Sequence, residues 1–246
     1  GSAAQGACEF MAEFADASTR GRIFGFHRAM DHSGAVIGPL IATLFLFAWP
    51  GEYRTLFALT IIPGALAVWM LSRVDEASST LNVQLPRSKH VVSTIAMPRR
   101  LWAVLGIILI FSLGNSADAF LLLRLSTALG HDAYLPLLWA SLHVVKASLS
   151  VYGGALSDRV GRKAVIVAGW SVYAVVYLGF ALSDSPALLV AWFLTYGVYF
   201  GLAEGTEKAL VADLAPAIAR GTAFGFYNAA LGVGALLASV IFGVLY

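Results

Sequence analysis

Seven apolar segments, each about twenty residues long, dominate this chain and limit what it can fold into. They run over residues 28–49, 55–73, 101–123, 134–156, 164–183, 186–208 and 222–245. A helix needs about 20 mostly apolar residues to cross the hydrocarbon core of a bilayer. Most of the segments are separated by short polar or Pro/Gly turns, and none shows strand-type alternation. The sequence therefore predicts an all-α, polytopic bundle of membrane helices.

The composition excludes several classes of protein. Hydrophobic residues make up 59% of the chain and charged residues only 12%, whereas a soluble domain carries about 25% charged residues. A net charge of +2 with basic residues in short loops argues against a nucleic-acid partner. Cys8 is the single cysteine, so no internal disulfide or cysteine-based metal site can form. We find no phosphate-binding glycine loop, zinc-type histidine motif or nucleophile elbow, so the sequence predicts neither an enzyme nor a cofactor or metal site.

The basic residues indicate how the segments are oriented. Alternate loops contain most of them, namely Arg20, Arg22, Arg73, Arg87, Lys89, Arg99, Arg100, Arg159, Arg162, Lys163 and Arg220. The positive-inside rule places these loops, and the start of the chain, in the cytoplasm, with the protein in the plasma or inner membrane. The polar segment 75–100 is expected to be a cytoplasmic linker. Residues 1–10 lack a secretory signal and are expected to be cloning-derived or disordered.

An internal repeat relates residues 11–46 to residues 211–246 at an offset of 200, without gaps. The string Arg-Gly-x-x-Phe-Gly-Phe begins at Arg20 and again at Arg220, and both copies enter an outward-going segment. A parallel repeat of this kind is typical of transporters built from two similar halves. Six segments lie from the first copy of the repeat up to, but not including, the second copy. This period fits a protein with six helices in each half.

Residues 154–163 read Gly-Ala-Leu-Ser-Asp-Arg-Val-Gly-Arg-Lys. This loop closely resembles the signature of the major facilitator superfamily, and it falls between two segments on the cytoplasmic side. From the residues alone, Asp158 precedes the next helix, where its carboxylate can cap free N–H groups, and the basic residues can anchor the loop at the inner leaflet. The resemblance implies a conformational latch that stabilises one access state, formed by Gly154, Asp158, Arg159, Gly161, Arg162 and Lys163.

The resemblance also implies an organisation for the chain. It covers helices 5–11 of a twelve-helix transporter, so that residues 11–74 form the last two helices of the N-terminal bundle. Residues 75–100 are then the linker, and residues 101–246 form the first five helices of the C-terminal bundle. The remaining helices would come from the full-length protein.

A second motif lies on the first segment. Gly34, Gly38 and Pro39 resemble the core of the fifth-helix motif of antiporters in this family, although Leu40 and Ile41 replace its usual glycine pair. The glycine spacing predicts a flat packing face, and the proline predicts a kink.

Charged residues within the segments are candidates for function, because a charge at mid-bilayer costs about 2.5–3.5 kcal/mol. Arg28, Asp31 and His32 share one helix face, where they serve either transport or a local salt bridge at the helix entry. Asn115 and Asp118 lie one turn apart on the third segment, and Asp118 is a candidate proton or cation carrier.

For each of two further sets of charged or polar residues, two interpretations remain open. His143 and Lys146 lie one turn apart, and Lys146 either contacts substrate or pairs with a buried acid. Glu204 can pair with Lys208 and, with Glu207, form a gate, or the pair can simply sit beside a glycine stripe that packs helices closely.

These features together predict a secondary active transporter of a small organic solute that works by alternating access. Proton-coupled efflux by antiport is the first hypothesis. Symport or uptake of a metabolite is the alternative, and a non-transporting membrane scaffold, a sensor or an inactive fragment is the interpretation of a different class. The expected partners are a small solute, protons and the lipid bilayer, with no nucleic acid.

Overall fold

The computed structural model describes residues 15–73, 96–115, 118–130 and 135–245. The expectations for residues 1–10 and for most of the linker, 75–95, lie outside these ranges. All regular elements within them are helical. They are α2 (Arg20–Ala48), α3 (Tyr53–Leu59), α4 (Ile61–Ser72), α6 (Arg99–Gly114), α7 (Asp118–Leu129), α8 (Leu135–Val160), α9 (Arg162–Leu182), α10 (Pro186–Leu214), the short η1 (Ala217–Ala219) and α11 (Arg220–Leu245).

The prediction of an all-α membrane bundle is confirmed. Among the described residues, seven helical stretches are long and apolar enough to cross a membrane, and each overlaps one predicted segment. α2 begins at Arg20 rather than near residue 28, because helical backbone extends into polar residues that a count of apolar residues omits. The protein is therefore a multi-pass membrane protein.

Two of the predicted spans are each built from two helices. α3 ends at Leu59 and α4 begins at Ile61; Pro63 has no N–H to donate to the carbonyl of Leu59, so the ladder is interrupted there. α6 ends at Gly114, and Asn115 takes an extended conformation. The Tyr173 hydroxyl of α9 donates to the free carbonyl of Gly114 at 2.5 Å, which satisfies this helix end inside the bundle.

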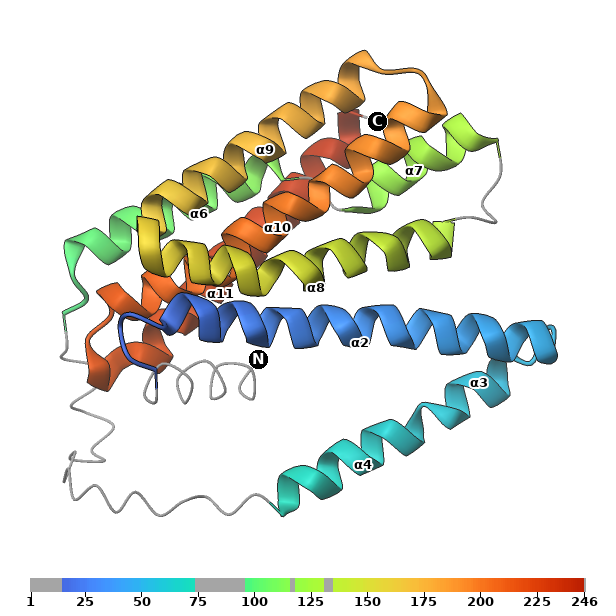
Figure 1. Ribbon diagram of the computed structural model, residues 1–246, viewed down its shortest axis with the longest axis horizontal. Helices are drawn as coiled ribbons and strands as arrows, with labels where there is room; N and C mark the ends of the chain where they lie inside the picture. Colours follow the sequence, from blue (N-terminus) through green and yellow to red (C-terminus); the bar gives the residue numbers. More distant parts are fainter. Residues whose placement is uncertain (1–14, 74–95, 116–117, 131–134, 246) are drawn as a thin grey trace.

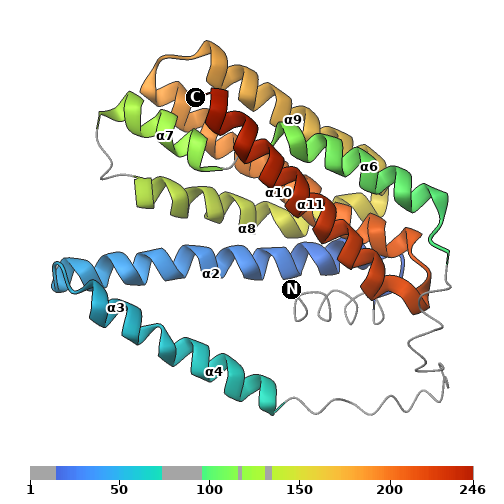
Figure 2. The same ribbon diagram turned by 180° about the vertical axis from the view of Figure 1, so that it is seen from behind.

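The helices are arranged around α8 and α10. α2 lies along α8, α10 packs against α2, α8 and α9, and α11 packs along α6 (Figures 1 and 2). α3 and α4 turn back from the far end of α2 and diverge from the other helices (Figure 1). Many apolar side chains point outward, among them Leu178, Val240 and Leu182, as expected for a surface in contact with lipid.

The two copies of the sequence repeat meet in the core. Phe24 of α2 and Phe224 of α11, which are equivalent residues in the repeat, are both buried, with ring centroids 5.8 Å apart. They belong to one apolar cluster that also holds Leu101 and Leu105 of α6. The repeat is thus visible in the packing as well as in the sequence.

Glycines bring α2, α8 and α10 into backbone contact. A Cβ atom added to Gly153 would overlap the carbonyl of Gly201, and one added to Gly154 would overlap the carbonyl of Gly21. Gly205 likewise lies against the backbone at Gly25. The predicted close packing along the glycine stripe of α10 is confirmed, and it extends to α2.

Gly154→Ala should therefore destabilise the protein by about 1–3 kcal/mol, the usual cost of overpacking. The added methyl group would meet backbone atoms of α2, which cannot rotate away. Gly38→Ala is the matched control, since an added Cβ there meets no described atom within 4 Å and alanine favours a helix. Thermal unfolding of the purified protein in detergent measures both effects. Equal melting temperatures for the two variants would contradict the close contact between α2 and α8.

Candidate functional site

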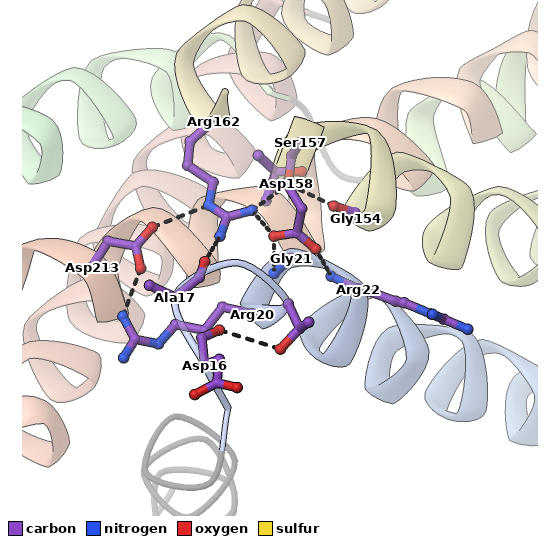
Figure 3. A network of polar contacts seen from close by, with 12 residues as sticks. Asp16, Ala17, Arg20, Gly21, Arg22, Gly154, Ser157, Asp158, Arg162 and Asp213 are labelled. Atoms are coloured by element: carbon purple, nitrogen blue, oxygen red, sulfur yellow. Dashed lines mark hydrogen bonds and ion pairs between the residues drawn. The ribbon is translucent and has the colours of Figure 1, made fainter. Parts of the chain in front are cut away.

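Asp158, near the end of α8, binds the start of α2. Its two carboxylate oxygens accept hydrogen bonds from the backbone N–H groups of Gly21 and Arg22, each at 2.9 Å (Figure 3). These N–H groups have no partner within their own helix, and the residue that precedes α2, Thr19, makes no side-chain cap. Asp158 thus caps a helix that is distant in sequence and places its charge at the positive end of that helix dipole.

This contact corrects the prediction that Asp158 caps the following helix. α8 continues through Asp158 to Val160, so the carboxylate points sideways toward α2 rather than forward to α9. α9 instead begins after Gly161, whose φ of 96° favours glycine, and no side chain caps it.

Arg162 joins this cap to two more helices. Its guanidinium contacts the Asp158 carboxylate, and it donates to the Ser157 hydroxyl at 2.8 Å and to an Asp213 oxygen of α10 at 3.1 Å. Asp213 also accepts from Arg20 at 2.7 Å (Figure 3). We call Arg20, Asp158, Arg162 and Asp213, with the N–H groups of Gly21 and Arg22, the latch.

The other residues of the signature loop have different positions. Gly154 packs against α2, and Gly161 forms the turn between α8 and α9. Arg159 and Lys163 are exposed, where they are free to meet lipid headgroups. Arg20 and Asp213 complete the latch, and the sequence analysis assigned neither of them to it. The repeat could have drawn attention to both, because it pairs Arg20 with Arg220 and Asp213 with Glu13.

A second polar cluster joins α2 to α8 and α10. Arg28 pairs with Asp31 at 2.9 Å and with Glu204, and His32 Nε2 lies 3.1 Å from the other Glu204 oxygen. His32 Nδ1 lies 3.2 Å from His143 Nδ1 on α8. We call these five residues the relay cluster. Glu204 lies nine residues before Asp213 on α10, roughly 14 Å from the latch along the helix.

The relay cluster also changes two expectations. The local Arg28–Asp31 pair forms, but Arg28 and His32 also reach across to α10. Glu204 contacts these two α2 residues, where the sequence suggested Lys208 as its partner. Glu207 faces away from this cluster: it is buried and accepts from Trp170 of α9 at 3.0 Å and from Tyr227 of α11 at 3.1 Å.

One neutral arrangement of protons satisfies every hydrogen bond of the cluster. Two Nδ1 atoms in contact must be one donor and one acceptor, because neutral imidazole carries one N–H. If His143 donates to His32 Nδ1, then His32 can donate from Nε2 to Glu204, and each contact is satisfied. The result is a directed chain from α8 through α2 to α10.

A third polar cluster lies at the break between α6 and α7. Lys146 of α8 is 2% exposed, and its Nζ pairs with Asp118 Oδ2 at 3.3 Å. The Tyr196 hydroxyl of α10 lies 3.0 Å from Asp118 Oδ1 and 3.2 Å from Asn115 Oδ1. The acid that pairs with Lys146 is therefore Asp118, which is half-buried rather than buried as expected.

Aromatic rings surround the Lys146 ammonium. Nζ lies 3.4 Å from the centroid of the Phe200 ring, 5.8 Å from that of Trp139 and 5.9 Å from that of Tyr196. We call these three rings the aromatic cage. Sequence reasoning missed it, although Tyr196, Phe200 and Glu204 recur every four residues on α10 and so share a helix face.

The predicted fifth-helix motif lies outside all three clusters. Gly34 and Gly38 are exposed, and an added Cβ at either would meet no described atom within 4 Å. α2 is a single helix across Pro39. A packing role for this motif stays a prediction. Among the described residues, no group of three His, Cys, Asp or Glu side chains is arranged to hold a metal ion.

Comparisons with known proteins place the chain among similar sequences. A sequence profile described as the Major Facilitator Superfamily matches residues 1–239. An uncharacterized MFS-type transporter of Methanocaldococcus jannaschii is 31% identical over 234 residues, which are 93% of this chain and 58% of that protein. An uncharacterized protein of Mycobacterium tuberculosis is 27% identical over 238 residues, 94% of this chain and 58% of that protein.

A more distant similarity is partial. The quinolone resistance protein NorA of Staphylococcus aureus is 27% identical over 111 residues, 45% of this chain and 29% of NorA. No solved structure matches the chain. The chain spans 58% of the length of the first two relatives.

The profile match covers nearly the whole chain, and the loop that first suggested the family forms the latch. The chain belongs to the Major Facilitator Superfamily.

Proposed function

We propose that the full-length protein is a secondary active transporter that exchanges protons for a small organic solute by alternating access. One observation carries this proposal: Glu204 of α10 is bound by Arg28 and His32 of α2 inside the span. Charged groups at this depth require partners, and contacts between separate helices can be exchanged as the helices move.

In this proposal α2, α3 and α4 belong to one bundle and α6–α11 to the other. The latch and the relay cluster then both lie between bundles, and rocking of the bundles breaks and remakes them. The latch end faces the cytoplasm, because the basic loops lie at that end. The period of the repeat, and the 58% share of the relatives, support further helices in the whole transporter.

Protons are the proposed coupling ion. The chain from His143 through His32 to Glu204 consists of groups that bind and release protons, and it crosses the proposed bundle boundary. Efflux is the proposed direction. It is supported by the resemblance of Gly34, Gly38 and Pro39 to an antiporter motif and by the partial likeness to a protein named for quinolone resistance. The proposed location is the plasma or inner membrane.

Proteoliposomes that contain the full-length protein test this function. A fluoroquinolone such as norfloxacin serves as the probe, and a pH-sensitive dye reports proton movement. We expect an imposed pH gradient to drive norfloxacin across the membrane, and norfloxacin to move protons in return. Glu204→Gln should abolish gradient-driven transport but preserve exchange of norfloxacin at equal pH, because the substitution removes a proton-binding group.

Asp184→Asn is the matched control. Asp184 is a fully exposed acid in the loop between α9 and α10, where it pairs with Arg124 at 2.9 Å, so its loss should leave transport unchanged. Gradient-driven transport in Glu204→Gln at the wild-type rate would contradict the assigned coupling role. If the wild-type protein moves neither norfloxacin nor a permanent organic cation such as benzyltrimethylammonium, and neither compound moves protons, this transport proposal is wrong.

A further inference from the structure

The aromatic cage around Lys146 has the construction of a binding site for an organic cation. Three rings from two helices, Trp139 of α8 and Tyr196 and Phe200 of α10, lie within 6 Å of one ammonium group. The faces of aromatic rings carry partial negative charge, and cages of this kind bind quaternary and methylated ammonium ions.

The polar groups beside the cage also favour a cation. Asp118 supplies a carboxylate 3.3 Å from the ammonium, and Tyr196 holds its other oxygen at 3.0 Å. The side-chain amide oxygen of Asn115 accepts from the same Tyr196 hydroxyl. An anion that bound Lys146 would have to displace Asp118 and face the same ring faces, which repel it.

We propose that the transported solute is a monovalent organic cation whose ammonium group takes the place of Lys146 in the aromatic cage and beside Asp118. Lys146 then acts as a tethered competitor that fills the site when the solute is absent, so that neither the carboxylate nor the rings are left unpaired. This inference rests on the proposed transport function and names its substrate class.

The position of Asp118 supports an exchange of this kind. It lies in the first turn of α7, directly after the break in the span. The positive end of a helix dipole attracts a carboxylate at the helix N-terminus, whichever cation lies beside that carboxylate. The Tyr173 hydroxyl holds the other side of the break at the Gly114 carbonyl.

Isothermal titration of the full-length protein in detergent with benzyltrimethylammonium, a permanent cation with one aryl group, tests the inference. Wild-type protein should bind the probe. Phe200→Leu should weaken binding by about fivefold or more, the loss expected for one desolvated ring face. Phe47→Leu is the matched control, because Phe47 is 88% exposed on α2, and it should bind like wild type.

Lys146→Ala should bind the probe about tenfold more tightly than wild type, since it removes a competing charge pair of more than 1 kcal/mol. If this variant does not fold, the comparison between Phe200→Leu and Phe47→Leu still tests whether the probe binds in the aromatic cage. Equal affinities in those two variants, or wild-type protein that binds salicylate and not benzyltrimethylammonium, would overturn the assignment. Because norfloxacin transport is measured separately, a transporter that moves norfloxacin without binding benzyltrimethylammonium refutes the substrate class and leaves the transport function standing.

Discussion

Asp158→Asn should open the latch and, in the proposed alternating-access cycle, shift the protein toward the state in which the latch end is accessible. The Asp158 carboxylate accepts two backbone N–H bonds from α2 and contacts Arg162. Hydrogen bonds to a charged group contribute about 1.5–3 kcal/mol each, and asparagine retains one acceptor oxygen without the charge. A loss of about 2–3 kcal/mol changes the balance between two states by roughly 30- to 150-fold.

Distances between spin labels measure this opening. In a Cys8→Ser background, cysteine labels in place of Arg22 and Arg159, both exposed at the latch end, report the separation of α2 from α8. We expect a longer distance in Asp158→Asn and a large fall in transport. Asp184→Asn, at the other end of the bundle, should change neither. An unchanged distance distribution in Asp158→Asn would show that the latch does not hold the two helices together.

Arg28→Met should have the second large effect, on folding itself. Arg28 binds both Asp31 and Glu204, so its removal leaves two carboxylates without their guanidinium inside the span. Removing one partner of a fully buried ion pair costs about 3–5 kcal/mol. The loss here should be smaller, because 20% of the Arg28 side chain, 22% of Glu204 and 45% of Asp31 stay exposed. The variant should melt at a clearly lower temperature than the wild type.

A second substitution should rescue this loss. In the double variant Arg28→Met/Glu204→Gln, the added amide is neutral, and its oxygen can still accept the His32 Nε2–H bond. Thermal melts of the wild type, both single variants and the double variant form a cycle that isolates the coupling energy. Additive effects in that cycle would contradict a direct Arg28–Glu204 pair.

The sequence was sufficient to predict the class of fold. The hydropathy of the sequence was enough to predict the seven spans, because the ability of a helix to cross a bilayer depends on its composition and its length. The glycines of α10 were also recognised, since a spacing of four places them on one face. Family membership confirms the predicted class, a transporter family rather than an enzyme.

The sequence could not indicate which helices lie side by side. Asp158 caps α2 and Glu204 binds Arg28, across 137 and 176 residues respectively, and local spacing carries no information on such pairs. The interruption at Asn115 was missed for a different reason. A broken helix is as apolar as a continuous one, so only the hydrogen bonds reveal it.

The contact between Phe24 and Phe224 has a consequence for the history of the gene. The two residues descend from one ancestral position if the halves arose by duplication, and here each packs against its own copy. If a substitution changes the size of one of these two side chains, that side chain packs against the unchanged residue of the other half. Across related sequences, the positions equivalent to Phe24 and Phe224 should therefore vary together, so the duplication would leave its record as paired substitutions.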